Sequence, residues 1–137
     1  EKTLRDHYQI RAVLEGYACV LCVETGADLS ALQNCLKVSE EMIASGDSSR
    51  YSDMNQSFHY EIWNASGNEK LVTMLSELWN GLSMGVQTTE REYAKKSFAE
   101  HKKIYEAIAA KDAETARAQM EKHIRRSLED MLTRYRE

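Results

Sequence analysis

The strongest helical signal in the chain is DAETARAQMEKHIRRSLEDMLTRY, at residues 112–135. Its apolar side chains recur every three or four residues, a spacing that places them on one face of an α-helix. Asp112 stands where an N-terminal capping residue is expected. The apolar face would carry Ala116, Met120, Ile124, Leu128, Met131 and Tyr135. The stretch therefore predicts a long helix whose apolar face must pack against other helices.

The same periodicity continues outward over nearly the whole chain. It predicts a first helix over about 4–24, a fifth over about 95–110, and three helices between them. The expected caps of those three are Asp28, Ser48 or Ser49, and Asn68, while the glycines at 26, 46 and 67 are placed to end helices. Residues 85–93 have the weakest pattern and are expected to form a loop or a short extra turn. The apolar face of the first helix is expected to carry Ile10, Val13, Leu14, Tyr17 and Leu21.

Length and composition support one all-α domain. The 137 residues suit a single domain, and the chain has no Pro and only 6 Gly, too few turn residues for a sandwich or barrel. Amphipathic helices with short connections can bury their apolar faces only against one another. We therefore expect residues 1–137 to form an antiparallel bundle of six helices.

Charge and hydropathy exclude several classes of protein. The net charge is −4 with mixed signs throughout, so no basic groove for nucleic acid is indicated. No apolar run approaches the roughly 20 residues of a membrane span, and the first residues lack a signal-peptide pattern. The odd set Cys19, Cys22 and Cys35 indicates buried thiols in a reducing compartment rather than disulfides. The sequence predicts a soluble, cytoplasmic protein without a membrane segment.

Three histidines are the strongest candidates for chemistry. His59, His101 and His123 lie on three different predicted helices, each on or beside the apolar face. If these helices pack together, three neutral imidazoles could bind a divalent metal such as Zn²⁺ and leave a coordination position open. Asn55 precedes His59 by four residues and could add an oxygen ligand. The alternative is that each histidine hydrogen-bonds a core carbonyl.

Arg11 has two interpretations. It lies in an apolar stretch, four residues before Glu15, and can form an exposed ion pair with that residue. Alternatively, its guanidinium faces a pocket and binds a carboxylate ligand. No HExxH, phosphate-binding glycine loop, G-x-S-x-G or Glu-x-x-His motif accompanies these residues. We therefore expect a binding protein and no catalytic residues.

Five motifs occur in a recognisable order. They are Arg11-Ala-Val-Leu-Glu15, Asn55-x-x-Phe58-His59, Ala65-Ser-Gly-Asn68-x-x-Leu71, Glu100-His101-x-x-Ile104-Tyr-Glu-Ala107, and Asp112-Ala-Glu-x-Ala116-Arg117 with Met120-x-x-His123. Over residues 8–127 the chain resembles the FadR-type C-terminal ligand-binding domain (FCD) of GntR-family bacterial transcription regulators. The resemblance implies an all-α bundle of six or seven helices. It also implies an N-terminal winged helix-turn-helix domain, absent from this chain, that binds operator DNA as a homodimer; the start at Glu1 without Met fits a domain cut from a longer protein.

The resemblance also implies a ligand set. Many members of the family hold a divalent metal on an Asp and three His, and a small carboxylate effector binds at the open positions. The three histidines fall on His59, His101 and His123, the Asp position falls on Asn55, and Arg11 matches an arginine directed toward the effector. Zn²⁺ or Ni²⁺ is the expected metal. Two alternatives remain: a metal-free ligand-binding or structural dimerisation bundle, and a metallohydrolase with Glu15 as its base.

Overall fold

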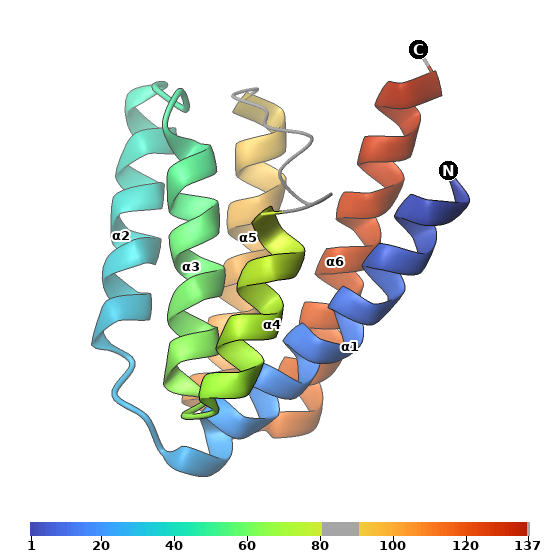
Figure 1. Cartoon of the computed structure of the whole chain (residues 1–137). Coiled ribbons are helices and arrows are strands. Elements are labelled where there is room, and N and C mark those ends of the chain that lie inside the picture. The colour runs from blue at the N-terminus through green and yellow to red at the C-terminus, as the bar shows by residue number, and fades with distance from the viewer. Residues whose placement is uncertain (81–90, 137) are drawn as a thin grey trace.

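A computed structural model describes residues 1–80 and 91–136, and within these ranges it contains six α-helices and no strand. Successive helices run in opposite directions, and both chain ends lie at the same end of the bundle (Figure 1). The predicted all-α antiparallel bundle is confirmed. The helices are α1 (Lys2–Thr25), α2 (Ser30–Ser45), α3 (Tyr51–Ala65), α4 (Glu69–Asn80), α5 (Arg91–Ala109) and α6 (Ala113–Arg136).

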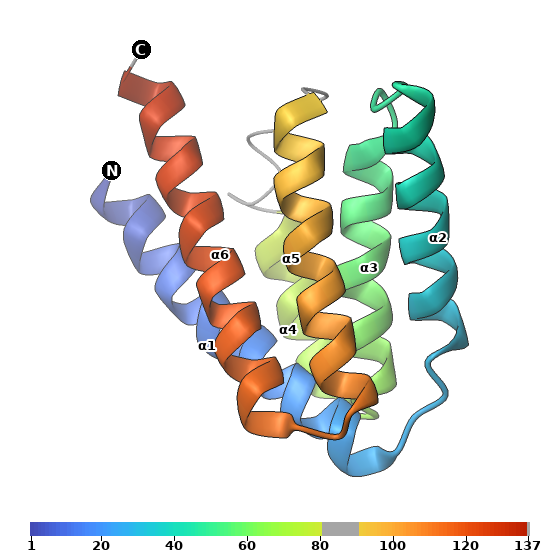
Figure 2. The ribbon, with the colours of Figure 1, turned by 180° about the vertical axis from the view of Figure 1, so that it is seen from behind.

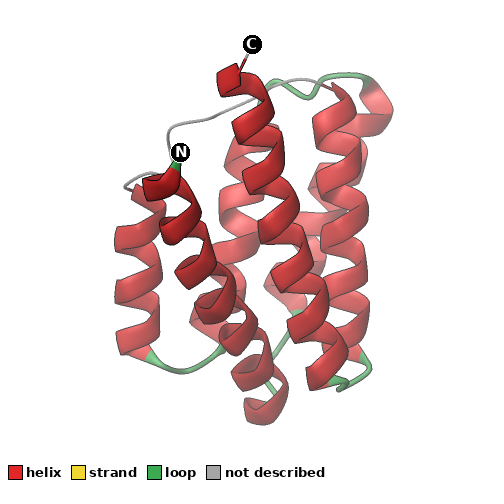
Figure 3. Ribbon diagram, turned by 90° about the vertical axis from the view of Figure 1, so that its right-hand side faces the viewer, coloured by secondary structure: helices red, strands yellow, loops and turns green. Residues whose placement is uncertain are grey.

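The helices α1 and α6 form a pair that leans away from the upright α2 and α3 (Figures 1 and 2). α1 packs most extensively against α6, and α5 lies against both α6 and α2. Gly16 allows the close approach of α1 and α6, because a Cβ there would lie 3.0 Å from Arg117 Cγ and 3.1 Å from Glu121 Cγ. The loops drawn in green between helices are short (Figure 3). No described helix is both long and apolar enough to cross a membrane.

Several helix ends follow the predicted signals. Gly26 and Gly46 adopt left-handed backbone conformations, with φ of 63° and 80°, directly after α1 and α2. Asn68 Oδ1 accepts the Leu71 backbone N–H at 3.0 Å, and Asp112 Oδ1 accepts that of Thr115 at 3.1 Å, so both predicted caps are present. These local bonds begin α4 and α6 at the predicted positions.

Other helix starts differ from the prediction. Leu29, not Asp28, precedes the first helical residue of α2, although Asp28 Oδ1 accepts the Ser30 N–H at 3.0 Å. Arg50, not Ser48 or Ser49, precedes α3, because Asp47 Oδ1 accepts the Ser49 N–H and forms a turn of its own. α5 begins at Arg91, so residues 91–93 of the predicted loop are helical, and residues 85–90 lie outside the described part.

The predicted apolar face of α1 is wrong at three of its five residues, whereas Leu14 and Leu21 are partly buried and pack against the core. Ile10, Val13 and Tyr17 are about half exposed (57%, 57% and 49%), whereas Arg11 and Glu15 are buried. The buried face of α1 combines this charged pair with small and aromatic residues: Tyr8, Ala12, Gly16, Ala18, Cys19 and Cys22. α1 therefore turns a charged pair, rather than its most apolar face, toward the bundle.

Candidate functional site

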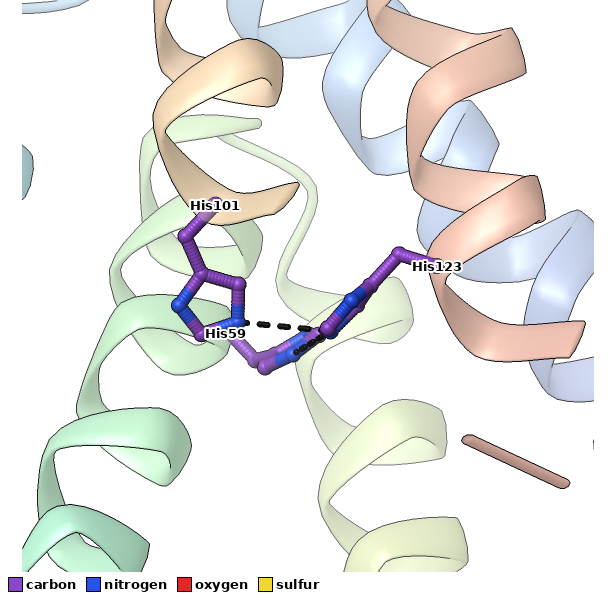
Figure 4. A group of neighbouring side chains, drawn as sticks. All are labelled: His59, His101 and His123. Carbon is purple, nitrogen blue, oxygen red and sulfur yellow. Dashed lines mark hydrogen bonds between the residues drawn. The ribbon is translucent and has the colours of Figure 1, made fainter. Parts of the chain in front are cut away.

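Three histidine rings meet in the interior of the bundle. His59 comes from α3, His101 from α5 and His123 from α6, and each is at most 2% exposed (Figure 4). His123 Nε2 lies 3.3 Å from His59 Nε2 and 3.3 Å from His101 Nε2. One ligating nitrogen from each ring lies within 4.8 Å of the others. The structure thus brings together the three rings that the sequence singled out.

Glu15 binds the His59 ring at Nδ1, on the side away from the other two histidines. The His59 Nδ1–H donates to Glu15 Oε1 at 2.5 Å, and the Trp63 indole N–H donates to the same oxygen at 2.9 Å. Arg11 Nε donates to the other oxygen, Oε2, at 2.7 Å. In a neutral His59 ring whose hydrogen is on Nδ1, Nε2 presents a lone pair to the other two rings.

Glu100 does the same for His123. The His123 Nδ1–H donates to Glu100 Oε1 at 2.5 Å, and Arg126 Nε donates to Glu100 Oε2 at 2.5 Å. Arg126 also forms an ion pair with Asp130. The site therefore contains two carboxylate–histidine pairs, each with an arginine on the far side of the carboxylate. This arrangement fixes the orientation of metal-binding imidazoles in proteins.

His101 has a different environment. Its ring stacks on Phe58 with 4.0 Å between the ring centroids. The Tyr51 hydroxyl lies 3.5 Å from His101 Nδ1 and donates to Ser97 Oγ at 2.8 Å. Aromatic packing and nearby hydroxyls position this third ring.

The electrostatics favour neutral rings at His101 and His123 and ionised carboxylates at Glu15 and Glu100. Burial and the neighbouring histidines place the pKa of His101 well below its usual value, and burial lowers the pKa of His123 to about 4. Burial alone would raise the pKa of Glu15, but His59 and Arg11 outweigh it and lower that pKa to about 2. Burial likewise opposes ionisation of Glu100, yet hydrogen bonds from His123 and Arg126 lower its pKa. Neutral imidazole is the form that binds a metal.

Asn55 offers an oxygen donor next to the three histidine nitrogens. Asn55 Oδ1 is buried and, within the described ranges, has no hydrogen-bond partner. Asn55 precedes His59 by one turn of α3, so both residues are on the same face of that helix. Three imidazole nitrogens, with or without this amide oxygen, would make a nitrogen-rich set, which is a chemistry that suits Zn²⁺ or Ni²⁺ better than Mg²⁺ or Ca²⁺.

Arg11 is buried, with 5% of its surface exposed, and is paired with Glu15. The expectation of an Arg11–Glu15 pair is confirmed, but the pair is not exposed. Its guanidinium lies over the Trp79 ring, 4.5 Å from the ring centroid. Sequence reasoning missed Glu100 and Trp79 as members of this site. The adjacency of Glu100 to His101 gave only a weak signal, because neighbouring residues on a helix point in different directions.

The metal-free protein is expected to lose stability as the pH falls from about 6.5 to 4. Unfolded histidines take up protons near pH 6.5, whereas His123 resists protonation down to about pH 4. This one residue accounts for about 3 kcal/mol of lost stability over that range. Urea unfolding at several pH values would measure it. Glu15 contributes only below its unfolded pKa of 4.5. A profile that is flat between pH 6.5 and 4.5 would contradict the prediction.

Comparisons with known proteins identify the family. The family model "FCD domain" matches residues 6–126. The HTH-type transcriptional regulator LutR of Bacillus subtilis is 32% identical over 93% of this chain, which spans 61% of that relative. The solved structure of E. coli McbR/YncC superposes with a TM-score of 0.84 at 23% identity, covering 98% of this chain and 66% of that one, and supports the fold. The chain belongs to the FCD domain family of GntR-type transcription regulators, as its ordered motifs predict.

Proposed function

We propose that this chain is the effector-sensing domain of a GntR-family regulator and that it binds a divalent transition metal. His59, His101 and His123 are the proposed ligands, with Asn55 as a fourth. The observation that carries this proposal is the buried cluster in which Nε2 of His123 lies 3.3 Å from Nε2 of each neighbour. The carboxylates behind His59 and His123 support it, because they direct Nε2 toward a shared point.

The proposed effector is a small organic acid. A bound Zn²⁺ or Ni²⁺ supplies a Lewis acid that can hold a carboxylate oxygen. The chain's own residues orient the rings, exclude water and balance charge. Arg11 donates to the carboxylate that also binds His59, so it lies beside the cluster. We propose that its guanidinium also contacts the effector.

The regulatory role concerns the longer protein. The relative from Bacillus subtilis is an HTH-type transcriptional regulator, and this chain spans 61% of it. We propose that an N-terminal winged helix-turn-helix domain binds operator DNA, and that the protein acts as a cytoplasmic homodimer. Effector binding can change DNA affinity only if the effector's own affinity differs between the DNA-competent and the incompetent state of that dimer.

The hydrolase alternative is less favoured by the geometry. It needs a general base, and Glu15 is the candidate. Both oxygens of Glu15 accept hydrogen bonds, and its pKa of about 2 makes it a weak base at pH 7. A structural bundle without metal remains the other alternative. Calorimetric titration of chelator-treated protein with Zn²⁺ distinguishes the metal-binding domain from the metal-free bundle. One equivalent of bound Zn²⁺ supports our proposal, and no binding by the folded protein rejects it.

Asn55→Asp is expected to tighten metal binding in the absence of effector. A carboxylate adds the negative charge that the amide lacks, so affinity should rise by at least tenfold, or about 1.4 kcal/mol. Competition with a chromophoric chelator measures the change, and Asn64→Asp, on the exposed side of α3, is the matched control. The gain should shrink in the presence of acetate, which supplies negative charge itself. Equal Zn²⁺ affinity of the parent and Asn55→Asp would refute the role of Asn55.

A further inference from the structure

Three buried side-chain polar atoms lack a hydrogen-bond partner among the described residues: Asn55 Oδ1, Trp79 Nε1 and Arg126 Nη2. Asn55 and Trp79 border the histidine cluster, and Arg126 lies behind the carboxylate of Glu100. Asn55 is one turn before His59, the Trp79 ring centroid lies 5.2 Å from that of His59, and Arg126 donates to the carboxylate that binds His123. Buried polar atoms are nearly always paired, so their concentration at one place indicates a ligand-binding site.

The three atoms differ in what they can bind. Asn55 Oδ1 is an acceptor and suits a cation, whereas the other two are N–H donors and cannot bind a metal. Trp79 and Arg126 therefore call for a ligand with acceptor oxygens. An anion satisfies them best, because hydrogen bonds to charged groups are stronger than those between neutral groups.

Trp79 is held firmly enough to act as a directional donor. It is 6% exposed and packs edge-on against Trp63, with 5.9 Å between the ring centroids. The Arg11 guanidinium lies over its ring, an arrangement that also draws positive charge to this side of the site. The N–H of Trp63, in contrast, already donates to Glu15. The chain's two tryptophans thus lie side by side with their donors in different states.

We propose that Trp79 Nε1–H and Arg126 Nη2–H donate hydrogen bonds to the carboxylate effector, with Trp79 as a specificity-determining contact. This inference rests on the proposed effector-binding function. Trp79 contacts the site from the His59 side, and Arg126 reaches it from the His123 side through Glu100. The chemical class that fits is a small carboxylic acid with more than one acceptor oxygen. An uncharged amide of the same size should bind poorly.

Trp79→Phe tests the inference, because it keeps an aromatic ring beside His59 and removes the N–H donor together with part of the indole ring. The probes are acetate, glycolate, malonate and succinate, with acetamide as the uncharged comparison, titrated calorimetrically into Zn²⁺-loaded protein. Affinity for the carboxylates that bind the parent should fall by about 10- to 100-fold. Zn²⁺ affinity should stay within about threefold of the parent's, since no ligand or its carboxylate partner has changed.

Three further variants make the result specific: a second test at Arg126 and controls at Trp63 and Arg125. Trp63→Phe removes the same chemical group from the neighbouring ring, and it should weaken Zn²⁺ binding because Glu15 loses a donor. Arg126→Lys keeps a positive charge near Glu100 but removes Nη2 together with the Nε that donates to Glu100, so it should weaken carboxylate binding. Arg125→Lys, at an exposed neighbouring position, should leave carboxylate binding unchanged.

The outcomes separate this inference from the proposed function. Retained Zn²⁺ binding with unchanged carboxylate affinity in both Trp79→Phe and Arg126→Lys overturns the inference and leaves the metal site intact. A second outcome is a parent that binds a carboxylate but not Zn²⁺, together with a Trp79→Phe variant that loses the carboxylate. That result supports the inference and refutes the metal site. A parent that binds none of the carboxylates overturns the inference, whatever its affinity for Zn²⁺.

Discussion

Glu15→Gln is expected to destabilise the protein by about 3–5 kcal/mol, because it removes the buried carboxylate that is paired with the Arg11 guanidinium. The Glu15 side chain is fully buried and that of Arg11 is 6% exposed, so solvent cannot replace the lost carboxylate. The His59 ring would also lose the charged acceptor that fixes its orientation. Urea unfolding of the metal-free protein measures the change in the free energy of unfolding.

Asp6→Asn is the matched control for Glu15→Gln. Lys2 and Asp6 have the same four-residue spacing on α1, but both side chains are largely exposed. Loss of this exposed Lys2–Asp6 ion pair should change the free energy of unfolding by no more than about 0.5 kcal/mol. The double variant Arg11→Met with Glu15→Gln removes both charges and should recover part of the lost stability. A cost below about 1 kcal/mol for Glu15→Gln would show that the buried pair does not have this structural role.

Adding Zn²⁺ to the metal-free protein is expected to raise the melting temperature by roughly 10–20 °C. A ligand present at about 1,000 times its Kd stabilises the folded state by about 4 kcal/mol, and a domain of this size converts that into such a shift. Differential scanning calorimetry with and without a chelator measures it. The cause is that only the folded chain brings the three histidines together.

His101→Ala should abolish the Zn²⁺-induced shift. Its ring contacts hydroxyls and Phe58 rather than a buried carboxylate, so removing it exposes no uncompensated charge. His7→Ala is the control, because His7 lies on the first turns of α1 and outside the cluster. An unchanged Zn²⁺ response in His101→Ala would exclude that residue as a ligand.

Much of the fold follows from local sequence signals. The apolar face of α6 is buried from Ala116 to Met131, as its spacing predicts, and Tyr135 lies outside the residues whose side chains are described. Gly26, Gly46, Asn68 and Asp112 mark helix ends because their effects act within one turn of the chain. Helix spacing and capping together were sufficient to predict an antiparallel bundle.

The burial of α1 could not be predicted in this way. Its spacing placed Ile10, Val13 and Tyr17 on an apolar face, yet these residues are about half exposed. The buried face contains Arg11 and Glu15, whose burial is favourable only because His59 and Trp63 arrive from α3 to complete their hydrogen bonds. Such compensation depends on partners more than 40 residues away, which periodicity cannot detect.

The residues of the candidate site also fall into those that the sequence could predict and those that it could not. His59, His101 and His123 could be singled out because each is a polar residue beside an apolar face. Glu100 could not be placed, because its partner His123 lies on the next helix. No sequence signal separates Trp79 from an ordinary core residue, and only the packing around it shows that its N–H has no partner among the described residues. Sequence spacing thus indicates the inner residues of the site, whereas tertiary contacts define those around them.

The most direct test of the metal site is the metal content per chain, measured by elemental analysis on protein purified without a His-tag, beside His101→Ala. Our account predicts about one equivalent of a transition metal in the parent and almost none in the variant. No metal in either protein, with a folded parent that also fails to bind added Zn²⁺ or Ni²⁺, would contradict it. The three histidines would then be interpreted as direct effector contacts or as core residues.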